Sequence, residues 1–64
     1  MNKQDKKQLA VKIMTDIENQ TTVSRYVLKD DKAFMGFFAD MLNDGNYSEL
    51  VITDKLLNYV NNNY

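Results

Sequence analysis

The chain has 64 residues, a formal net charge of −1, and neither cysteine nor histidine. This composition excludes disulfides, thiolate metal sites and a histidine general base, and the length predicts a single domain over residues 1–64. Because a fold this small buries only about 60% of the surface of its unfolded chain, we expect a protein partner, or a second copy in a homodimer, to stabilise it.

Apolar residues recur at helical spacing near the start of the chain and predict a helix over residues 3–19. They are Leu9, Ala10, Ile13, Met14 and Ile17, whereas Val11 falls outside the stripe. Residues 1–12 are basic, with four lysines against the single acid Asp5: Lys3, Lys6, Lys7 and Lys12. If the chain bound a nucleic acid, these lysines would be the residues that neutralise phosphates.

The segment over residues 23–28 fits two structures. Its apolar spacing fits a short helix, which Thr21 or Thr22 could cap, while its β-branched and aromatic residues also fit a strand. We favour the helix, because no clear second strand is present to pair with it. The alternative is an α+β fold with a short strand pair at about 23–28 and 48–53.

The strongest periodicity lies in the middle of the chain, where apolar residues follow one another at i, i+3, i+4, i+7 and i+8. They are Phe34, Phe37, Phe38, Met41 and Leu42. Asp30 or Asp31 offers an N-cap before them. Gly45 can take the left-handed conformation that stops helices, so this helix should end near Asn43.

A last helix is predicted after Gly45, with Asn46 as its N-cap and Glu49 completing a capping box. Its apolar side holds Ile52, Leu56, Leu57, Tyr59 and Val60. The competing interpretation is a strand that ends at Thr53, followed by a shorter helix that Thr53 caps. We favour the single helix because its polar face is nearly continuous.

Together these elements predict an all-α fold, a compact bundle of three or four short helices. The apolar stripes of the helices should meet in one core. Its expected members are Leu9, Ile13, Ile17, Phe34, Phe38, Met41, Leu42, Leu56, Leu57 and Val60.

Several classes of function have little support in the sequence. Ser and Thr nucleophiles lack an activating base, so we expect no enzyme. A calcium loop placed around Gly45 would have Leu42 and Ile52 at ligand positions, so we expect no metal and no cofactor. No apolar run approaches the about 20 residues of a membrane span, and no signal segment is visible, which predicts a cytoplasmic protein.

The middle helix also predicts a partner-binding surface. Its apolar arc spans about half of the circumference, wider than the ~100° stripe that packing on one core requires. Met35 and Phe37 lie at opposite edges of this arc, and Asp40 and Asp44 continue the Phe37 edge. Aromatic residues and methionine are enriched in interfaces, so we expect these four residues to contact a protein partner.

The expected function is therefore a small non-enzymatic protein-binding module that regulates or inhibits a larger protein. An enrichment in residues with A/T-rich codons suggests a gene of a low-GC bacterium, its phage or another mobile element. The alternative is a small DNA-binding regulator of the helix-turn-helix kind. Acidic residues at 30, 31, 40 and 44 would repel phosphates from its reading helix, so nucleic acid is the less favoured partner.

Overall fold

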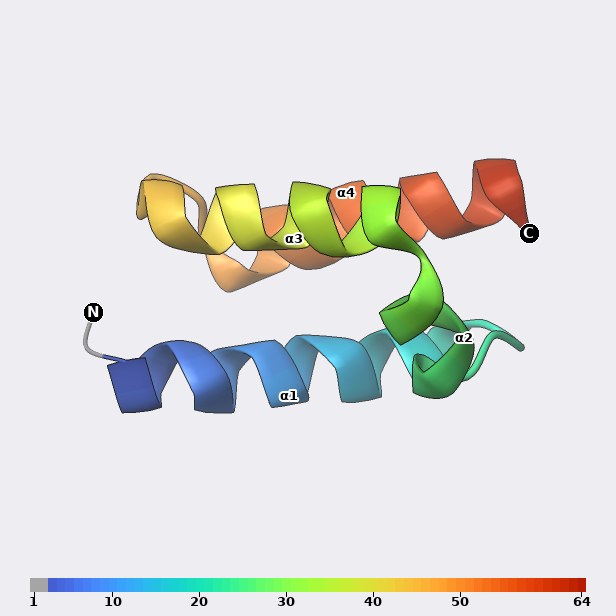
Figure 1. The fold of residues 1–64 in the computed structure, drawn as a ribbon, viewed down its shortest axis with the longest axis horizontal. Helices are drawn as coiled ribbons and strands as arrows, with labels where there is room; N and C mark the ends of the chain where they lie inside the picture. The colour runs from blue at the N-terminus through green and yellow to red at the C-terminus, as the bar shows by residue number, and fades with distance from the viewer. Residues whose placement is uncertain (1–2) are drawn as a thin grey trace.

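The computed structural model describes residues 3–64, with side chains from residue 5 onward, and contains four α-helices (Figure 1). They are α1 (Lys3–Gln20), α2 (Arg25–Asp30), α3 (Lys32–Asp44) and α4 (Glu49–Asn63). These residues contain no strand, so the predicted all-α bundle is confirmed and the α+β alternative is wrong. The two segments considered as strands are mainly helical because a serine caps the first turn of each helix.

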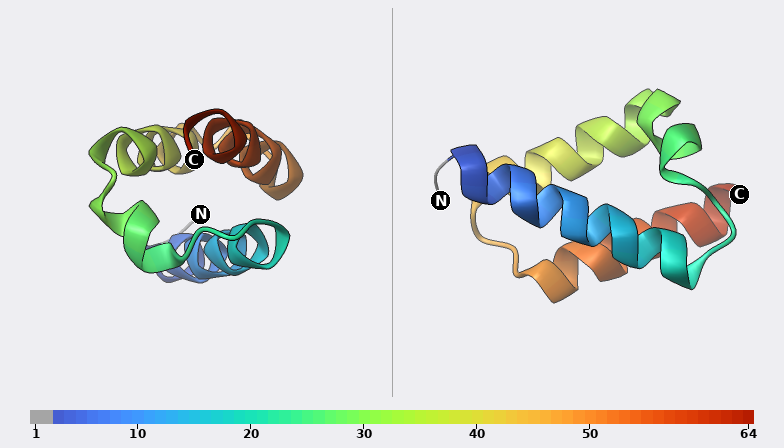
Figure 2. Two further views of the ribbon diagram at one scale, coloured as in Figure 1. Left: turned by 90° about the vertical axis from the view of Figure 1, so that its right-hand side faces the viewer. Right: turned by 90° about the horizontal axis from the view of Figure 1, so that it is seen from below.

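The helices form two layers of two. Figure 2 shows α3 and α4 side by side in one layer, with α1 and α2 in the other. α1 packs on α4, α2 packs on α1 and α3, and α3 packs on α4, whereas α1 and α3 approach each other less closely. The radius of gyration is 10.9 Å, close to the about 10.7 Å expected for a compact domain of this length.

Asp31 and Gly45 set the limits of α3. The Asp31 carboxylate accepts a hydrogen bond from the Phe34 N–H at 3.0 Å and caps α3, which is one of the two caps predicted. The backbone N–H of Asp31 also donates to the Leu28 carbonyl at 3.1 Å and ends α2. Gly45 has φ 77°, the left-handed conformation predicted for it.

The predicted cap of α2 is wrong. Ser24 caps this helix, because its Oγ accepts a hydrogen bond from the Val27 N–H at 3.4 Å. Neither Thr21 nor Thr22 has this role. Thr21 instead donates its hydroxyl to the Ile17 carbonyl at 2.8 Å, so it satisfies the end of α1 rather than the start of α2.

The predicted cap of α4 is also wrong. Ser48 caps the helix by accepting a hydrogen bond from the Val51 N–H at 3.2 Å. Asn46 uses its side-chain amide to donate to the Asp44 carboxylate at 2.6 Å and stays in the turn. Glu49 consequently lies in the first turn, where its charge suits the positive end of the helix dipole.

Ten hydrophobic side chains are buried and form one core: Ile13, Met14, Ile17, Leu28, Phe34, Phe38, Met41, Ile52, Leu56 and Val60. Phe34 is fully buried and packs edge to face on Phe38 and Tyr59, at centroid distances of 6.1 and 5.7 Å. Such aromatic pairs add to the stability that burial alone provides.

The observed core differs from the predicted core at its edges. Leu9, Leu42 and Leu57 are only partly buried and pack against the core from outside. Leu28 is fully buried although it was not predicted. A helix of six residues is too short to show an apolar stripe in the sequence, so the single inward residue of α2 gave no periodic signal.

Candidate functional site

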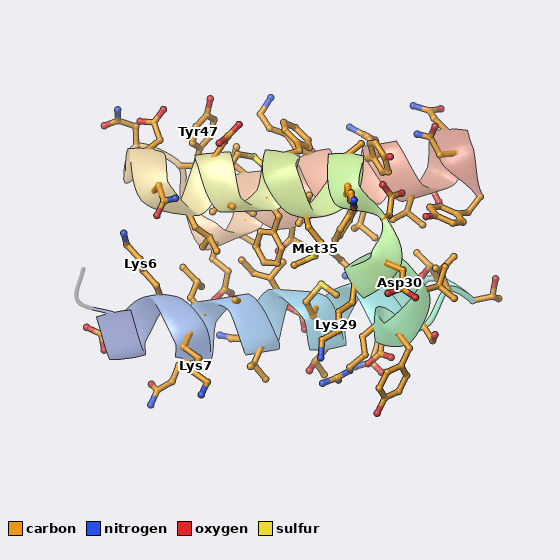
Figure 3. The ribbon with its side chains drawn as sticks, viewed as in Figure 1. Lys6, Lys7, Lys29, Asp30, Met35 and Tyr47 are labelled. Atoms are coloured by element: carbon orange, nitrogen blue, oxygen red, sulfur yellow. The ribbon has the colours of Figure 1, made fainter. Side chains whose placement is uncertain are left out.

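An apolar groove lies between α1, α2 and α3, on the side where α1 and α3 approach each other less closely. We call it the α1–α3 groove; its volume is about 190 Å³. Figure 3 shows Met35 directed into the space between α3 and α1. The lining residues are Ala10, Val11 and Met14 of α1, Arg25 and Lys29 of α2, and Met35 and Phe38 of α3.

The groove opens directly onto the core. Helical spacing places Val11 and Met14 on one flank of α1, and Met35 and Phe38 one turn apart on α3. Met14 and Phe38 are buried, at 7% and 2% exposure, and they form the floor. Val11 is 51% exposed and forms part of the rim. An apolar side chain that entered the groove would therefore contact core residues.

Arg25 ties α2 to α1, and its charge is balanced within the chain. Its Nε donates to Glu18 Oε1 at 2.7 Å, its Nη2 lies 2.6 Å from the same oxygen, and its backbone N–H donates to Oε2 at 2.9 Å. The side-chain and then the backbone hydrogen bonds from Arg25 hold the pKa of Glu18 below its usual value. Both groups are therefore ionised at neutral pH.

One lysine lines the groove without a salt bridge. Lys29 lines it, and its Nζ lies 6.0 Å from the centroid of the Tyr26 ring. Lys7 is exposed on α1 but does not line the groove, and its side chain projects away from α3 (Figure 3). Among the described side chains, no carboxylate lies within salt-bridge distance of either lysine. Lys29 therefore adds one positive charge to the lining of the groove.

The predicted partner-binding residues do not form one surface. Phe37 is 40% exposed, and Asp40 and Asp44 are exposed on the same edge of α3. Met35 is partly buried on the opposite edge, where it lines the α1–α3 groove. Met35 and Phe37 are separated by the width of α3, so one small contact cannot cover both. The binding role of each edge stays a prediction.

The lysines considered for nucleic-acid binding point in different directions. Lys6 donates to the Asn43 side chain of α3 at 3.2 Å, and Lys12 forms a salt bridge with Glu49 of α4 at 3.3 Å. In Figure 3, Lys6 projects toward α3 and Lys7 projects to the other side of α1. The side chain of Lys3 lies outside the described residues. The three described lysines therefore present no common basic face.

Sequence reasoning missed the groove, although one signal for it was present. Val11 is an apolar residue outside the core-facing stripe of its helix, and the structure places it among the residues that line the groove. Nothing in the sequence around Arg25 and Lys29 indicated that they would line a groove. They reach the groove only because α2 turns across the end of α1, which the sequence pattern does not encode.

A polar cluster holds α4 against α3 at the end of the molecule where α2 joins α3. Asp31 accepts hydrogen bonds from the Tyr59 hydroxyl at 3.0 Å and from the Tyr64 hydroxyl at 2.6 Å. The bond from Tyr64, followed by that from the Phe34 N–H, lowers the pKa of Asp31. The same bond to Asp31 raises the pKa of Tyr64 to about 12. A carboxylate with a lowered pKa is a weak base, so the cluster is suited to structure rather than catalysis.

A larger hollow of about 570 Å³ runs along α4 and the end of α1. Five of its eight lining residues are polar: Gln20, Thr53, Asp54, Lys55 and Asn58. Leu50 borders it and is 79% exposed, and the buried Thr53 hydroxyl has no hydrogen-bond partner. Most of its lining is polar and comes from α4 alone, so it offers less apolar contact than the α1–α3 groove, which three helices line.

Residues 5–64 show no group of three or more acidic side chains that could hold a metal ion. None of the helices in the described part of the chain is long and apolar enough to cross a membrane. Comparison with family models, with curated proteins and with solved structures gives no match to this chain. Function must therefore be inferred from the geometry and charge of the surface.

Proposed function

We propose that this chain is a small, non-enzymatic protein-binding module that regulates or inhibits a larger protein, and that the α1–α3 groove is its docking site. The observation that carries the proposal is the groove itself. Its floor is made of core residues, its rim includes the half-exposed Val11, and two of its seven lining residues are methionines. Methionine adapts to irregular surfaces and is enriched in interfaces.

The size of the groove favours a protein partner over a small molecule. Small-molecule sites usually have volumes of about 300–1,000 Å³, whereas the α1–α3 groove has about 190 Å³. This volume suits a few side chains of a larger body that is also held by the rim. The half-exposed Val11 and the charged Lys29 would form such a rim around a buried apolar anchor.

The test uses two matched variants of exposed valines. Val11→Glu places a charge at the groove, and Val51→Glu places the same charge on α4, where Val51 is 42% exposed. Both variants and the wild type would be immobilised and exposed to host lysate, and retained proteins would be identified by mass spectrometry. We expect a protein that the wild type and Val51→Glu retain and Val11→Glu loses, and whose activity the purified wild type changes.

If no retained protein depended on Val11, the groove would not be the docking site. A protein lost only with Phe37→Ala would instead place docking on the Phe37 edge of α3. In that case Asp40 and Asp44 would form its charged rim, as the sequence predicts.

A further inference from the structure

We propose that Met35 is a site of reversible oxidation, and that its sulfoxide makes one wall of the α1–α3 groove polar and weakens apolar docking there. The oxidant is a peroxide, and a thiol-dependent reductase restores the thioether. The inference rests on the proposed function, because it concerns the regulation of the same groove. Its chemical part, the selective oxidation of Met35, is independent of any partner.

The composition of the chain directs oxidation to methionine. The chain has four methionines and contains neither cysteine nor tryptophan. Cysteine and methionine are the side chains whose sulfur is oxidised stepwise and, at the first step, reversibly. Since no thiolate is present to compete for the oxidant, a peroxide that reaches this molecule meets only methionine sulfur.

Burial separates the three methionines whose side chains the structure describes. Met41 is 3% exposed and does not line the groove, and Met14 is 7% exposed and lies in the groove floor. Met35 is the one of the three that is only partly buried. Figure 3 shows its side chain directed into the space between α3 and α1. Because susceptibility to oxidation follows exposure, Met35 should react before the other two.

The reaction transfers one oxygen atom and two electrons. The sulfur lone pair of Met35 attacks one oxygen of hydrogen peroxide and forms the S–O bond while the O–O bond breaks. The second oxygen leaves as water with the proton of the first. The thioether is thereby oxidised and the peroxide is reduced. In the reverse reaction, a methionine sulfoxide reductase uses two thiols, which form a disulfide and release the oxygen as water.

The added oxygen should change the groove more than it changes the fold. Met35 packs against the core from its edge, and the groove beside it is open. The sulfoxide oxygen can therefore remain in contact with water when the groove is empty. An apolar anchor that entered the groove would cover this oxygen, and burying a polar group without a hydrogen bond is unfavourable. Oxidation should therefore weaken docking while the chain stays folded.

The experiment treats the purified protein with limiting hydrogen peroxide and follows each methionine by fragmentation mass spectrometry. We expect Met35 to be oxidised more than about tenfold faster than Met41, which reacts only when the core opens. Incubation with methionine sulfoxide reductases and a thiol should remove the added oxygen. Nuclear magnetic resonance of carbon-13-labelled methionine methyl groups should then report on the groove. Oxidation of Met35 should shift the signal of Met14, which lines the same groove, more than that of Met41.

Met35→Leu is the matched variant, because leucine has a similar volume and contains no sulfur. After the same treatment its Met14 signal should stay in place. Circular dichroism of the oxidised wild type should show a folded, helical protein. Oxidation of Met41 as fast as Met35 would overturn the inference. A protein that unfolds once Met35 alone is oxidised would also overturn it, because the oxygen would then damage the core instead of altering a groove wall.

The lysate experiment separates this regulation from the proposed function. A retained protein that depends on Val11 should be lost when Met35 is oxidised and recovered after reduction, and peroxide-treated Met35→Leu should keep it. Equal retention by the oxidised and the reduced wild type would refute the regulation and leave the docking groove in place. If no retained protein depended on Val11, the proposed function and its regulation would both fail, whereas mass spectrometry would still decide whether Met35 is the oxidation site.

Discussion

The two long sides of α3 are built differently. On the side of α4, Tyr59 packs on Phe34 and donates to Asp31, and Tyr64 adds a second hydroxyl to the same carboxylate. On the side of α1, Met35 lines a groove that remains open. Directional hydrogen bonds fix one side, whereas adaptable apolar side chains line the other. Structural rigidity and the proposed docking thus lie on opposite sides of one helix.

This difference follows from the chain path. α3 and α4 are joined by a short turn and pack directly on each other. α1 and α3 are separated in the sequence by α2, which packs on both of them and takes part of the space between them. The shortest helix therefore bridges the side of α3 on which the α1–α3 groove lies.

Phe38→Ala should have the largest effect, because Phe38 is both a core residue and the floor of the groove. Truncating a buried phenylalanine costs about 3–5 kcal/mol of unfolding free energy. A domain of this size has little more stability than that. Circular dichroism should therefore show a largely unfolded protein at room temperature. A helical protein that melted like the wild type would show that the floor of the groove is not part of the core.

Phe37→Ala applies the same change one residue earlier, on the α4 side of α3. Phe37 is 40% exposed, so we expect a loss of only about 1–2 kcal/mol and a folded, helical protein. Denaturant unfolding of both variants would measure the difference directly. Equal losses would mean that Phe37 belongs to the core in solution and that the two sides of α3 are more alike than the structure indicates.

The polar side of α3 predicts a dependence of stability on pH. The folded pKa of Asp31 lies below its ordinary value of 3.8, so its contribution is full above that value and is lost as pH falls through the lower, folded pKa. The pKa of Tyr64 is raised from 10.0 to about 12, so its contribution is present below pH 10 and is lost as pH rises toward 12.

Melting temperatures across pH would test this prediction with Tyr64→Phe, which removes the hydroxyl and keeps the ring. The variant should lose the part of the alkaline dependence that Tyr64 contributes and show a smaller decline in acid. The part due to Tyr59 should remain, because burial and then its hydrogen bond to Asp31 also raise the pKa of Tyr59. Tyr26→Phe is the matched control, because Tyr26 is 73% exposed and lies outside the cluster. Identical profiles for Tyr64→Phe and the wild type would show that Tyr64 does not bind Asp31 in solution.

The smallest effect on stability is expected at the rim of the groove. Val11→Glu and Val51→Glu change side chains that are 51% and 42% exposed. Each should alter the unfolding free energy by less than about 0.5 kcal/mol, as is usual for surface substitutions. If the two variants are equally stable, a difference in binding between them cannot be attributed to unfolding. A large loss with Val11→Glu alone would mean that the groove is closed in solution.

The three longer helices were predictable because their apolar residues recur at helical spacing over long segments. The stripe from Phe34 to Met41 specifies the inner face of α3, and Gly45 specifies its end. The caps were harder to predict, because several Ser, Thr and Asn residues precede α2 and α4 and a cap depends on which of them reaches the right amide. The burial of Leu28 was not predicted because α2 is only six residues long. The same short length made the choice between helix and strand ambiguous for this segment.

The groove was less predictable than the fold. Met35 was expected to contact a partner, yet it was grouped with Phe37, which lies on the other side of α3. A helical wheel shows which residues share a face, but it does not show which neighbouring helix covers that face. Lys29 joins Met35 only through the packing of α2 on α3, and this is a property of tertiary structure.

The double role of Asp31 couples the opening of two helices. Its backbone N–H ends α2 and its carboxylate starts α3, so unfolding one helix removes a cap of the other. In hydrogen exchange, the amides of Asp31 and Phe34 should then open together, as one cooperative unit. Since α2 also forms a wall of the α1–α3 groove, each such opening would dismantle the groove for its duration. A docked partner would therefore slow exchange in α2 and α3 even at amides that it never touches.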